Sequence, residues 1–511
     1  MSAIAITRPL QDSFSQSPLL PRPSKPTRSK RLASRPARHP PALWLLSVAE
    51  AGERFGFYLM LALFTLYLNE RLKWTEEQAF NAYGWYMFFV YLSPFLGGVF
   101  ADRIFGYRRA VLTGATLLAC GYFLLGWPNM RAFYASLFLL VLGNGLFKPN
   151  ISTLVGNLYA QGDSRRDSAF SIFYMGINVG ALFAGPVGEA MRNELGWTAA
   201  FATAGCGMML SFVIFAIFRG HLAIADQRSS VSAILDVPLG PEYEDRPDPP
   251  EVERKRIAAL AIMCGIVMTF WMAFHQNGTT LTFWARDNTN RFITLIELRP
   301  LLQLQFKYYS WEIPPGVFSS VNSVFIILLT PPLVFVLGKL RKMKLEPSTP
   351  AKIGIGMLLT GGAYGVMVLA ALHGGNHGRV SMWWLIGCYF VITVGELFVS
   401  PMGLSMVTKL APRRMTAMLM GLWFLSTAIG NWLSGKTGAW FWKRWSHSEF
   451  FALLVCTSLF AAVVLLTQFR RLKAAMPPEG PSPDDSDIGT NASTTSPVPT
   501  TVTTATSTAT T

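Results

Sequence analysis

Twelve long apolar segments constrain the fold of this chain more than any other feature of its sequence. Each is long enough to cross a bilayer as a helix, which takes about 20 apolar residues. Because 51% of the residues are hydrophobic and only 14% are charged, a soluble globule could not bury this surface. The pattern predicts an all-α membrane protein with twelve spans, near residues 42–69, 82–101, 110–127, 132–158, 168–190, 197–218, 257–284, 316–338, 351–372, 381–407, 415–435 and 449–469.

Lysines and arginines gather in alternate connections between these segments and in the first 40 residues. Basic residues mark the cytoplasmic side of a membrane protein, so we expect both termini in the cytoplasm. We attribute the net charge of +15 to the basic residues that orient the protein in the membrane, and we expect no nucleic-acid partner. The five cysteines lie in separate apolar stretches without metal spacing, so we expect no metal site.

The chain divides into two halves of six spans each. Arg165-Arg166-Asp167-Ser168-Ala169 opens the fifth span as Arg413-Arg414-Met415-Thr416-Ala417 opens the eleventh, and such internal repeats are typical of secondary transporters. Their substrate sites lie near the bilayer midplane, between the halves. We expect a basic disordered arm, a six-helix bundle, a cytoplasmic linker, a second bundle and a disordered Thr-rich tail, at residues 1–40, 41–219, 220–256, 257–470 and 471–511.

The first span carries the charged sequence Glu50-Ala51-Gly52-Glu53-Arg54 near its middle. The two glutamates are three residues apart and therefore share a helix face. A charge at the bilayer centre costs about 2.5–3.5 kcal/mol on insertion scales. The cluster indicates an ion or substrate pathway, and the alternative is a structural charge that is paired or reaches the interface.

A loop motif follows the second span. Gly97-Gly98-x-x-Ala101-Asp102-Arg103-x-x-Gly106-x-Arg108-Arg109 resembles the signature of the major facilitator superfamily between its second and third helices. The resemblance implies a gating loop, in which the glycines allow close helix packing and the charges form and break contacts. A basic loop that only orients the protein would explain the arginines without the glycines and the aspartate. The implied gating residues are Gly97, Asp102, Arg103, Arg108 and Arg109.

Longer motifs resemble those of the proton-dependent oligopeptide transporter (POT/PTR) family, over about residues 40–470. Glu50-x-x-Glu53-Arg54-Phe55 is similar to that family's first-helix motif. The resemblance implies the major facilitator fold, with two pseudo-symmetric six-helix bundles. Other matching motifs are Gly143-Asn144-Gly145-Leu146-Phe147-Lys148-Pro149-Asn150, Phe173-Tyr174-x-x-Ile177-Asn178-x-Gly180, Pro314-Pro315-Gly316, Ser320-Val321-Asn322, Gly395-Glu396-Leu397-Phe398 and Met420-Gly421-x-Trp423-Phe424-Leu425.

The same resemblance implies roles for individual residues. Lys148 would exchange salt bridges with the first-helix cluster as protons bind and leave, and the alternative is a static buried pair that joins two helices. Glu396 would face the amino terminus of a bound peptide. The implied coupling residues are Glu50, Glu53, Arg54, Lys148 and His275, and the implied substrate-binding residues are Arg54, Tyr58, Tyr86, Lys148, Asn178, Trp271, His275, Asn322, Glu396, Trp423, Phe424 and Thr427.

Two positions depart from the family pattern. Leu61 stands where bacterial peptide carriers of the family usually have a second arginine, and His275 stands where they have an acidic residue before a glutamine. Histidine can take over proton transfer, because its unperturbed pKa of about 6.5 is near physiological pH. A hydrogen-bonded structural histidine is the alternative.

The resemblance predicts a symporter that imports di- and tripeptides with protons by alternating access. A symporter of nitrate or another non-peptide solute is the alternative that Leu61 keeps open. The histidines show no spacing suited to a metal or nucleophile set, so we expect no enzyme. We further expect no cofactor beyond the coupled proton, small peptides and the lipid bilayer as partners, a functional monomer, and a multi-pass location in the cell (cytoplasmic/inner) membrane.

Overall fold

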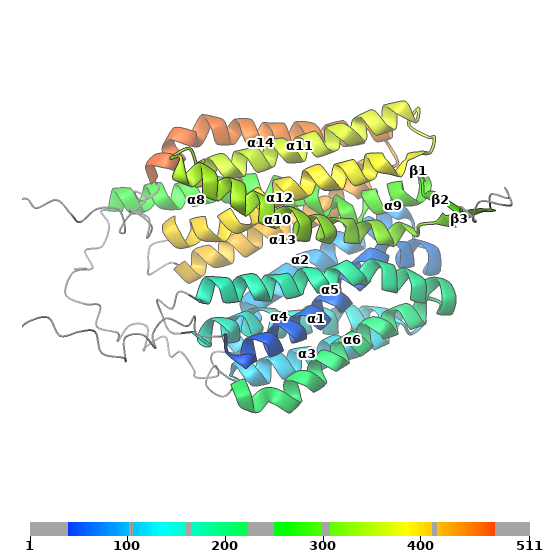
Figure 1. The fold of residues 1–511 in the computed structure, drawn as a ribbon, viewed down its shortest axis with the longest axis horizontal. Helices are drawn as coiled ribbons and strands as arrows, with labels where there is room; N and C mark the ends of the chain where they lie inside the picture. The colour runs from blue at the N-terminus through cyan, green and yellow to red at the C-terminus, as the bar shows by residue number, and fades with distance from the viewer. Residues whose placement is uncertain are drawn as a thin grey trace, which may run out of the picture. The chain divides into compact units, whose positions relative to one another are not determined.

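The computed structural model describes residues 39–101, 104, 106–159, 165–222, 250–297, 307–410 and 416–475. Over these residues the chain forms twelve long helices, so the predicted all-α fold is confirmed (Figure 1). The helices are α1 (Pro41–Leu66), α2 (Glu76–Phe100), α3 (Tyr107–Leu125), α4 (Met130–Asn157), α5 (Arg166–Leu195), α6 (Trp197–Phe218), α8 (Pro250–Phe274), α10 (Ser319–Lys342), α11 (Thr349–His373), α12 (Met382–Leu410), α13 (Thr416–Phe441) and α14 (His447–Ala475).

Local sequence sets several of the helix ends. Thr75 begins α2 with a capping box, in which its Oγ1 accepts a hydrogen bond from the Gln78 backbone N–H and its own N–H donates to the Gln78 side chain. Asn129 caps α4 by accepting from the Arg131 backbone N–H at 2.8 Å. Gly196 separates α5 from α6 with a φ of 87°, a conformation that glycine adopts without strain.

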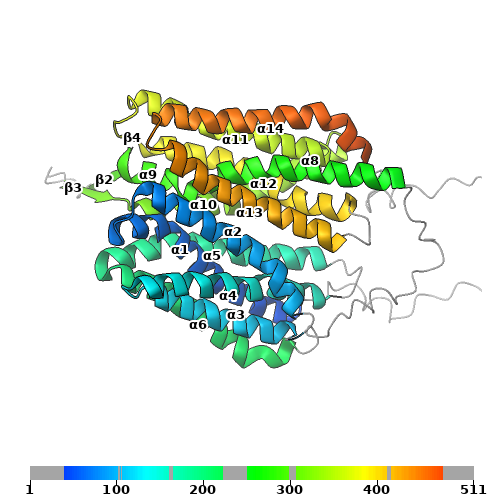
Figure 2. The ribbon, with the colours of Figure 1, turned by 180° about the vertical axis from the view of Figure 1, so that it is seen from behind.

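The helices build two cores. One contains buried residues of α1 to α6 and the other contains buried residues of α8 to α14, joined by Phe80 of α2. Within residues 41–475, Figure 1 shows α1, α3, α4 and α6 on one side and α8, α11, α12 and α14 on the other, and Figure 2 shows the same division from behind. Between these groups α5 packs against α10, and α2 packs against α13. These two pairs of helices therefore hold the two groups together.

The helices run between two loop ends. We name the end where α6 stops and α8 starts the proximal end, and the opposite one the distal end. Nearly all of the predicted linker and of both predicted tails, at residues 1–38, 223–249 and 476–511, lies outside the described part of the chain. Helices α8 and α14 each begin or end several residues beyond the predicted span. The additional turns carry charged side chains, which are hydrated outside the bilayer.

The predicted seventh span is not one continuous helix. Helix α8 ends at Phe274, a 3₁₀ turn covers His275–Gly278, and a short helix, α9, runs from Thr280–Asp287. The turn is held by its own polar side chains, since Thr280 Oγ1 donates to the Gln276 Oε1 at 2.7 Å. Broken helices in transporters mark sites where backbone groups line a cavity. The break therefore places His275 at a position of functional interest.

Short strands at the distal end were not predicted from the sequence. β1 (Thr289–Asn290) pairs in parallel with β4 (Val380–Ser381). β2 (Phe292–Glu297) and β3 (Lys307–Glu312) form an antiparallel hairpin in which Phe292 lies opposite Glu312. The hairpin leads through a 3₁₀ turn, Pro315–Phe318, into α10. It therefore connects the broken span to the helix that packs against α5.

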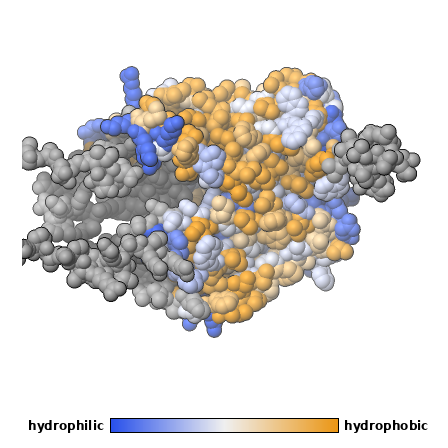
Figure 3. Space-filling model, in the orientation of Figure 1, coloured by the Kyte–Doolittle hydropathy of each residue, from blue (hydrophilic) through white to orange (hydrophobic). Residues whose placement is uncertain are grey.

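The surface fits a bilayer. Figure 3 shows mostly hydrophobic surface along the helices and hydrophilic residues toward the two loop ends. Eight helical segments of the described part are long and apolar enough to span a membrane by length and hydropathy. Helix α1 is not among them, since Glu50, Glu53 and Arg54 all lie near its middle. The charged cluster thus interrupts a helix whose flanks are apolar.

Glycines bring helices close together near the candidate site. A Cβ atom at Gly97 of α2 would overlap the carbonyl of Gly145 on α4. At the interface between the two groups of helices, a Cβ at Gly435 of α13 would lie 2.6 Å from the Cα of Gly84 on α2. Such contacts leave no room for a side chain.

Candidate substrate and coupling site

The charged cluster of α1 is buried and internally paired. Glu50, Glu53 and Arg54 expose 1%, 0% and 2% of their surface. The Arg54 Nε lies 3.3 Å from the Glu50 Oε1, one helical turn away, and also donates a hydrogen bond to Glu53. Its Nη2 donates to the Asn144 Oδ1 at 3.4 Å, while Asn144 is held by donation to the Val90 carbonyl at 2.9 Å. One guanidinium thus joins α1 to α4.

Each glutamate of this cluster keeps one oxygen without a hydrogen bond. The Glu50 Oε2 and the Glu53 Oε1 are buried and have no donor among the described residues. A buried acceptor without a donor is costly, and most buried polar groups are therefore satisfied. A proton bound at either oxygen would break no existing hydrogen bond.

Lys148 lies apart from these carboxylates in the described structure. Its Nζ is 5.2 Å from the centroid of the Tyr91 ring, and no ion pair joins it to Glu50 or Glu53 within 4.0 Å in that part of the chain. Arg54 holds both glutamates instead. The predicted exchange with Lys148 therefore stays a prediction, and it requires the carboxylates to leave Arg54.

His275 is enclosed by aromatic rings at the break in the seventh span. Its ring lies 5.6 Å from Trp271 and 6.0 Å from Tyr91, and its Nδ1 is 3.5 Å from the Tyr83 hydroxyl. Its Nε2 is buried without a hydrogen-bond partner among the described residues. The ring thus has one hydrogen-bond partner, the Tyr83 hydroxyl, and one nitrogen without a partner in the described part of the chain.

Tyr91 of α2 is a residue that the sequence analysis missed. It contacts the Lys148 ammonium on one side and the His275 ring on the other. It thereby connects two of the predicted coupling residues, one from each group of helices. A tyrosine in an apolar helix resembles ordinary packing, and only its position between two titratable groups distinguishes it.

A second polar site lies on the other group of helices. Asn322 of α10 donates from its Nδ2 to the Glu396 Oε2 of α12 at 3.0 Å and to the Thr393 Oγ1 at 2.9 Å. Glu396 is 8% exposed and has no cationic partner within 4.0 Å among the described residues. This carboxylate can therefore accept a cation from a ligand.

The remaining predicted binding residues differ in their surroundings. Tyr58 is 36% exposed, and its hydroxyl lies within electrostatic range of both Arg54 and Glu396. Tyr86 is buried and packs against the Phe64 ring at 5.4 Å, so here it is a core residue. The side chains of Asn178 and Thr427 donate hydrogen bonds to carbonyls of their own helices. Trp423 is buried and Phe424 is half-buried. The Trp271 Nε1 has no hydrogen-bond partner in the described part of the chain.

The structure describes the predicted gating loop only in part. Gly97 forms the close contact with α4, whereas Asp102 and Arg103 lie outside the described residues. Arg108 donates from its Nη1 to the Arg219 carbonyl at 3.2 Å, and Arg109 is exposed. This contact ties the start of α3 to the end of α6.

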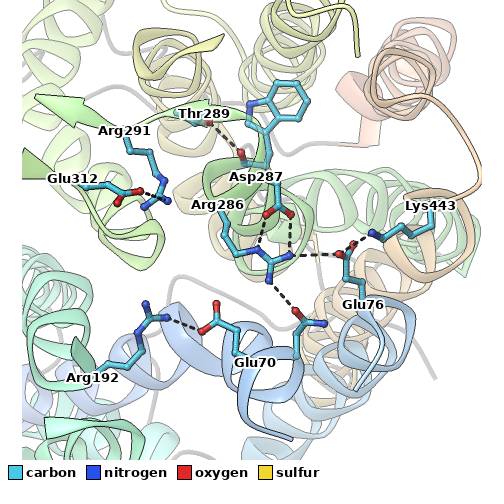
Figure 4. Close-up of polar contacts among 11 residues, drawn as sticks. Glu70, Glu76, Arg192, Arg286, Asp287, Thr289, Arg291, Glu312 and Lys443 are labelled. Atoms are coloured by element: carbon cyan, nitrogen blue, oxygen red, sulfur yellow. Dashed lines mark hydrogen bonds and ion pairs between the residues drawn. The ribbon is translucent and has the colours of Figure 1, made fainter. Parts of the chain in front are cut away.

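A polar network at the distal end joins the two groups of helices, and the sequence analysis did not predict it (Figure 4). Arg286 of α9 donates to the Asn69 Oδ1 at 2.8 Å and approaches the Glu76 Oε1 at 3.5 Å. Lys443, after α13, pairs with the same Glu76 oxygen at 3.0 Å. These contacts hold the two groups of helices together at the distal end.

Other pairs of the network stay within one group. Arg192 of α5 pairs with Glu70 at 3.3 Å, and Arg291 pairs with Glu312 at 2.6 Å. Burial lowers the pKa of Arg291. A cavity of 260 Å³ lies between these pairs and is also lined by Arg286 and the prolines before α10.

The described residues contain no cluster of three or more histidines, cysteines, aspartates or glutamates suited to a metal ion.

A family model described as the POT family matches residues 108–234 and 250–443. The chain belongs to the POT family. The predicted family is thus confirmed, and with it the interpretation of the chain as a multi-pass membrane transporter and not an enzyme.

Individual POT-family relatives match this transporter over most of its length. A di-/tripeptide transporter of Lactococcus lactis subsp. cremoris is 32% identical over 479 residues, which cover 84% of this chain and 94% of that protein. A solved peptide transporter POT in complex with sulfate has a TM-score of 0.74 and 30% identity, over 88% of this chain and 99% of that one. A POT family transporter in complex with a thioalcohol-conjugated peptide has a TM-score of 0.73 and 26% identity, over 84% and 96%.

Proposed function

We propose that this POT-family transporter imports di- and tripeptides together with protons. The observation that carries the proposal is that one group of helices supplies two cations and the other supplies a carboxylate that has no cationic partner among the described residues. Arg54 and Lys148 supply cations on α1 and α4, and Glu396 supplies an anion on α12. A peptide is a zwitterion, so its carboxylate and its ammonium suit the two sites.

Binding of the peptide carboxylate needs a cation that is not neutralised. Arg54 is shared between two glutamates, whereas Lys148 rests against an aromatic ring. Protonation of Glu50 or Glu53 at its unpartnered oxygen would weaken the pairing with Arg54. In this proposal the guanidinium and the ammonium then hold the peptide carboxylate, and proton and peptide move together.

His275 extends the proposed coupling to the second group of helices. A proton at its Nε2 would place a cation beside Tyr91 and within electrostatic range of Lys148. Two cations in one buried space repel each other, so loading of His275 would favour a carboxylate between them. The bound carboxylate would in turn draw the two groups of helices together.

Energy for uphill import would come from inward proton flow, worth about 2.3 kcal/mol per charge per 100 mV. Rocking of the helix groups about the site would expose it alternately to the two loop ends. In this proposal the protein is a functional monomer in the lipid bilayer of the cell membrane. The basic loops and both termini, at the proximal end, would face the cytoplasm.

The domain boundaries are part of the same proposal. Residues 41–219 and 257–470 would form the two rocking bundles, and residues 220–256 would form the linker between them. Separate cores on the two sides of this linker support the division. The segments 1–40 and 471–511 would be disordered arms on the cytoplasmic side.

Uptake into proteoliposomes under an imposed pH gradient tests the substrate. Dialanine and nitrate are compared at equal concentrations with the purified transporter. The proposal predicts that dialanine accumulates and nitrate does not. Nitrate accumulation without dialanine accumulation would establish the non-peptide alternative, which the names of the relatives above do not favour.

A further inference from the structure

One face of α5 is hydrogen bonded to the start of α10 across the two groups of helices. Ser320 of α10 donates from its Oγ to the Ala181 carbonyl at 3.1 Å and accepts from the Gly185 backbone N–H at 3.2 Å. One turn further along α5, Glu189 continues this row. Residues 181, 185 and 189 are four apart and therefore share a helix face.

Glu189 makes the contact nearest the distal end. Its Oε1 accepts a hydrogen bond from the Gly316 backbone N–H at 2.6 Å, in the 3₁₀ turn before α10. The side chain is 0% exposed. A Cβ at Gly316 would lie 2.7 Å from the same oxygen, so the backbone of the turn fits directly against the carboxylate.

The second carboxylate oxygen can receive a proton. The Glu189 Oε2 lies 3.0 Å from the Arg192 Nε but forms no hydrogen bond among the described residues. The other charged groups that face Glu189 are Glu70, which pairs with Arg192, and Arg291. All three neighbours line the 260 Å³ cavity at the distal end and Glu189 is buried behind them, so a proton that reaches the carboxylate from that side passes these residues.

We propose that Glu189 is a positioning residue for transport, whose protonation releases the contact between α5 and the start of α10 and so favours opening of the distal end. When ionised, the carboxylate pairs with Arg192 and accepts a charge-assisted hydrogen bond from Gly316. A neutral carboxyl loses the ion pair, and its hydrogen bond is about half as strong. Opening toward the side with more protons would suit proton-driven import.

A distance measurement tests this proposal in the full chain without any transport. Leu195 at the end of α5 and Leu372 near the end of α11 are exposed and lie on different groups of helices. Spin labels are attached at Leu195→Cys and Leu372→Cys, in a background whose five native cysteines are replaced by alanine. Their separation is measured in nanodiscs at about pH 8 and about pH 5, which span carboxylate titration.

The wild-type background should shift toward longer distances at the lower pH. Glu189→Gln, which cannot ionise, should show the long distances at both pH values. Glu194→Gln removes an exposed charge five residues further along the same helix and should behave as the wild type.

Three results would overturn the proposal. These are a Glu189→Gln protein with the wild-type pH shift, a Glu189→Gln protein with short distances at both pH values, or a wild-type distance that does not change with pH. The last result decides the matter even if the variant does not fold. The role of Glu189 in import rests on the proposed function, but its effect on the distance between the helix groups does not. If dialanine uptake fails, the distance measurement therefore still tests the role of Glu189.

Discussion

Replacing Glu396 by glutamine should remove recognition of the peptide ammonium while leaving the site intact. Glutamine keeps an oxygen that can accept the Asn322 Nδ2–H, which now donates to the Glu396 Oε2 at 3.0 Å. What is lost is the negative charge, at a side chain that is only 8% exposed. The expected defect is therefore in ligand binding and not in folding.

The size of the defect follows from one charged contact. A hydrogen bond to a charged group contributes about 1.5–3 kcal/mol. At 1.4 kcal/mol for each factor of ten, this corresponds to about 10- to 140-fold in affinity for dialanine. N-acetyl-dialanine has no ammonium and should bind the wild type more weakly by a similar factor.

The assay compares inhibition constants of dialanine and N-acetyl-dialanine in competition with a radiolabelled dipeptide. The ratio of the two constants should be large in the wild type and near one in Glu396→Gln. Thr393→Val removes the hydroxyl that also accepts from Asn322 without changing any charge, and it should keep the wild-type ratio. If Glu396→Gln weakens both ligands equally and the ratio persists, Glu396 does not bind the ammonium and the reasoning fails.

Three further predictions concern other parts of the molecule. His275→Gln should abolish proton-driven dialanine accumulation while leaving counterflow exchange, because it removes the free Nε2 from the coupling path; unchanged uphill uptake would place coupling on carboxylates alone. Gly97→Ala should lower the free energy of unfolding by about 1–3 kcal/mol, because its Cβ would overlap a carbonyl of α4, whereas Gly98→Ala, with nothing within 4 Å of its Cβ, should raise it by up to about 1 kcal/mol. Hydrogen bonds from Arg341 hold the pKa of Glu346, in the loop between α10 and α11, at about 2. Since the folded pKa is lowered, its stabilisation is full above the unfolded pKa of about 4.3 and is lost as the pH falls toward 2. Glu346→Gln should therefore lower the melting temperature by the same amount at about pH 8 and about pH 5, and an effect that is present at about pH 8 but absent at about pH 5 would contradict the assignment.

The helices could be predicted from the sequence because the bilayer leaves the chain few alternatives. Every backbone polar group must be satisfied inside the hydrocarbon, so a long apolar run becomes a helix. The first-helix cluster stood out for the same reason, since Glu50, Glu53 and Arg54 lie in a segment where charge is expensive. Their pairing with one another follows from their spacing on one helix.

Features that depend on contacts between distant residues could not be predicted. The hydrogen bonds from Arg286 to Asn69 and from Gly316 to Glu189 join residues that are far apart in the sequence. No local pattern indicates which polar side chains will meet when two groups of helices pack. The break at His275 did have a local signal, the polar run His275-Gln276-Asn277-Gly278-Thr279-Thr280 inside an apolar span, but mean hydropathy over the span does not distinguish an α-helix from a 3₁₀ turn.

The central claim is that a proton gradient drives dialanine uphill through this transporter. The most direct measurement is the ratio of internal to external dialanine in proteoliposomes with the outside more acidic by about one pH unit, at zero membrane potential, before and after a protonophore is added. One proton per peptide sets the limit at about tenfold, because one pH unit is worth about 1.4 kcal/mol. We predict accumulation toward that limit and collapse to equal concentrations with the protonophore. Dialanine that only equilibrates, with or without the gradient, would contradict proton-driven import.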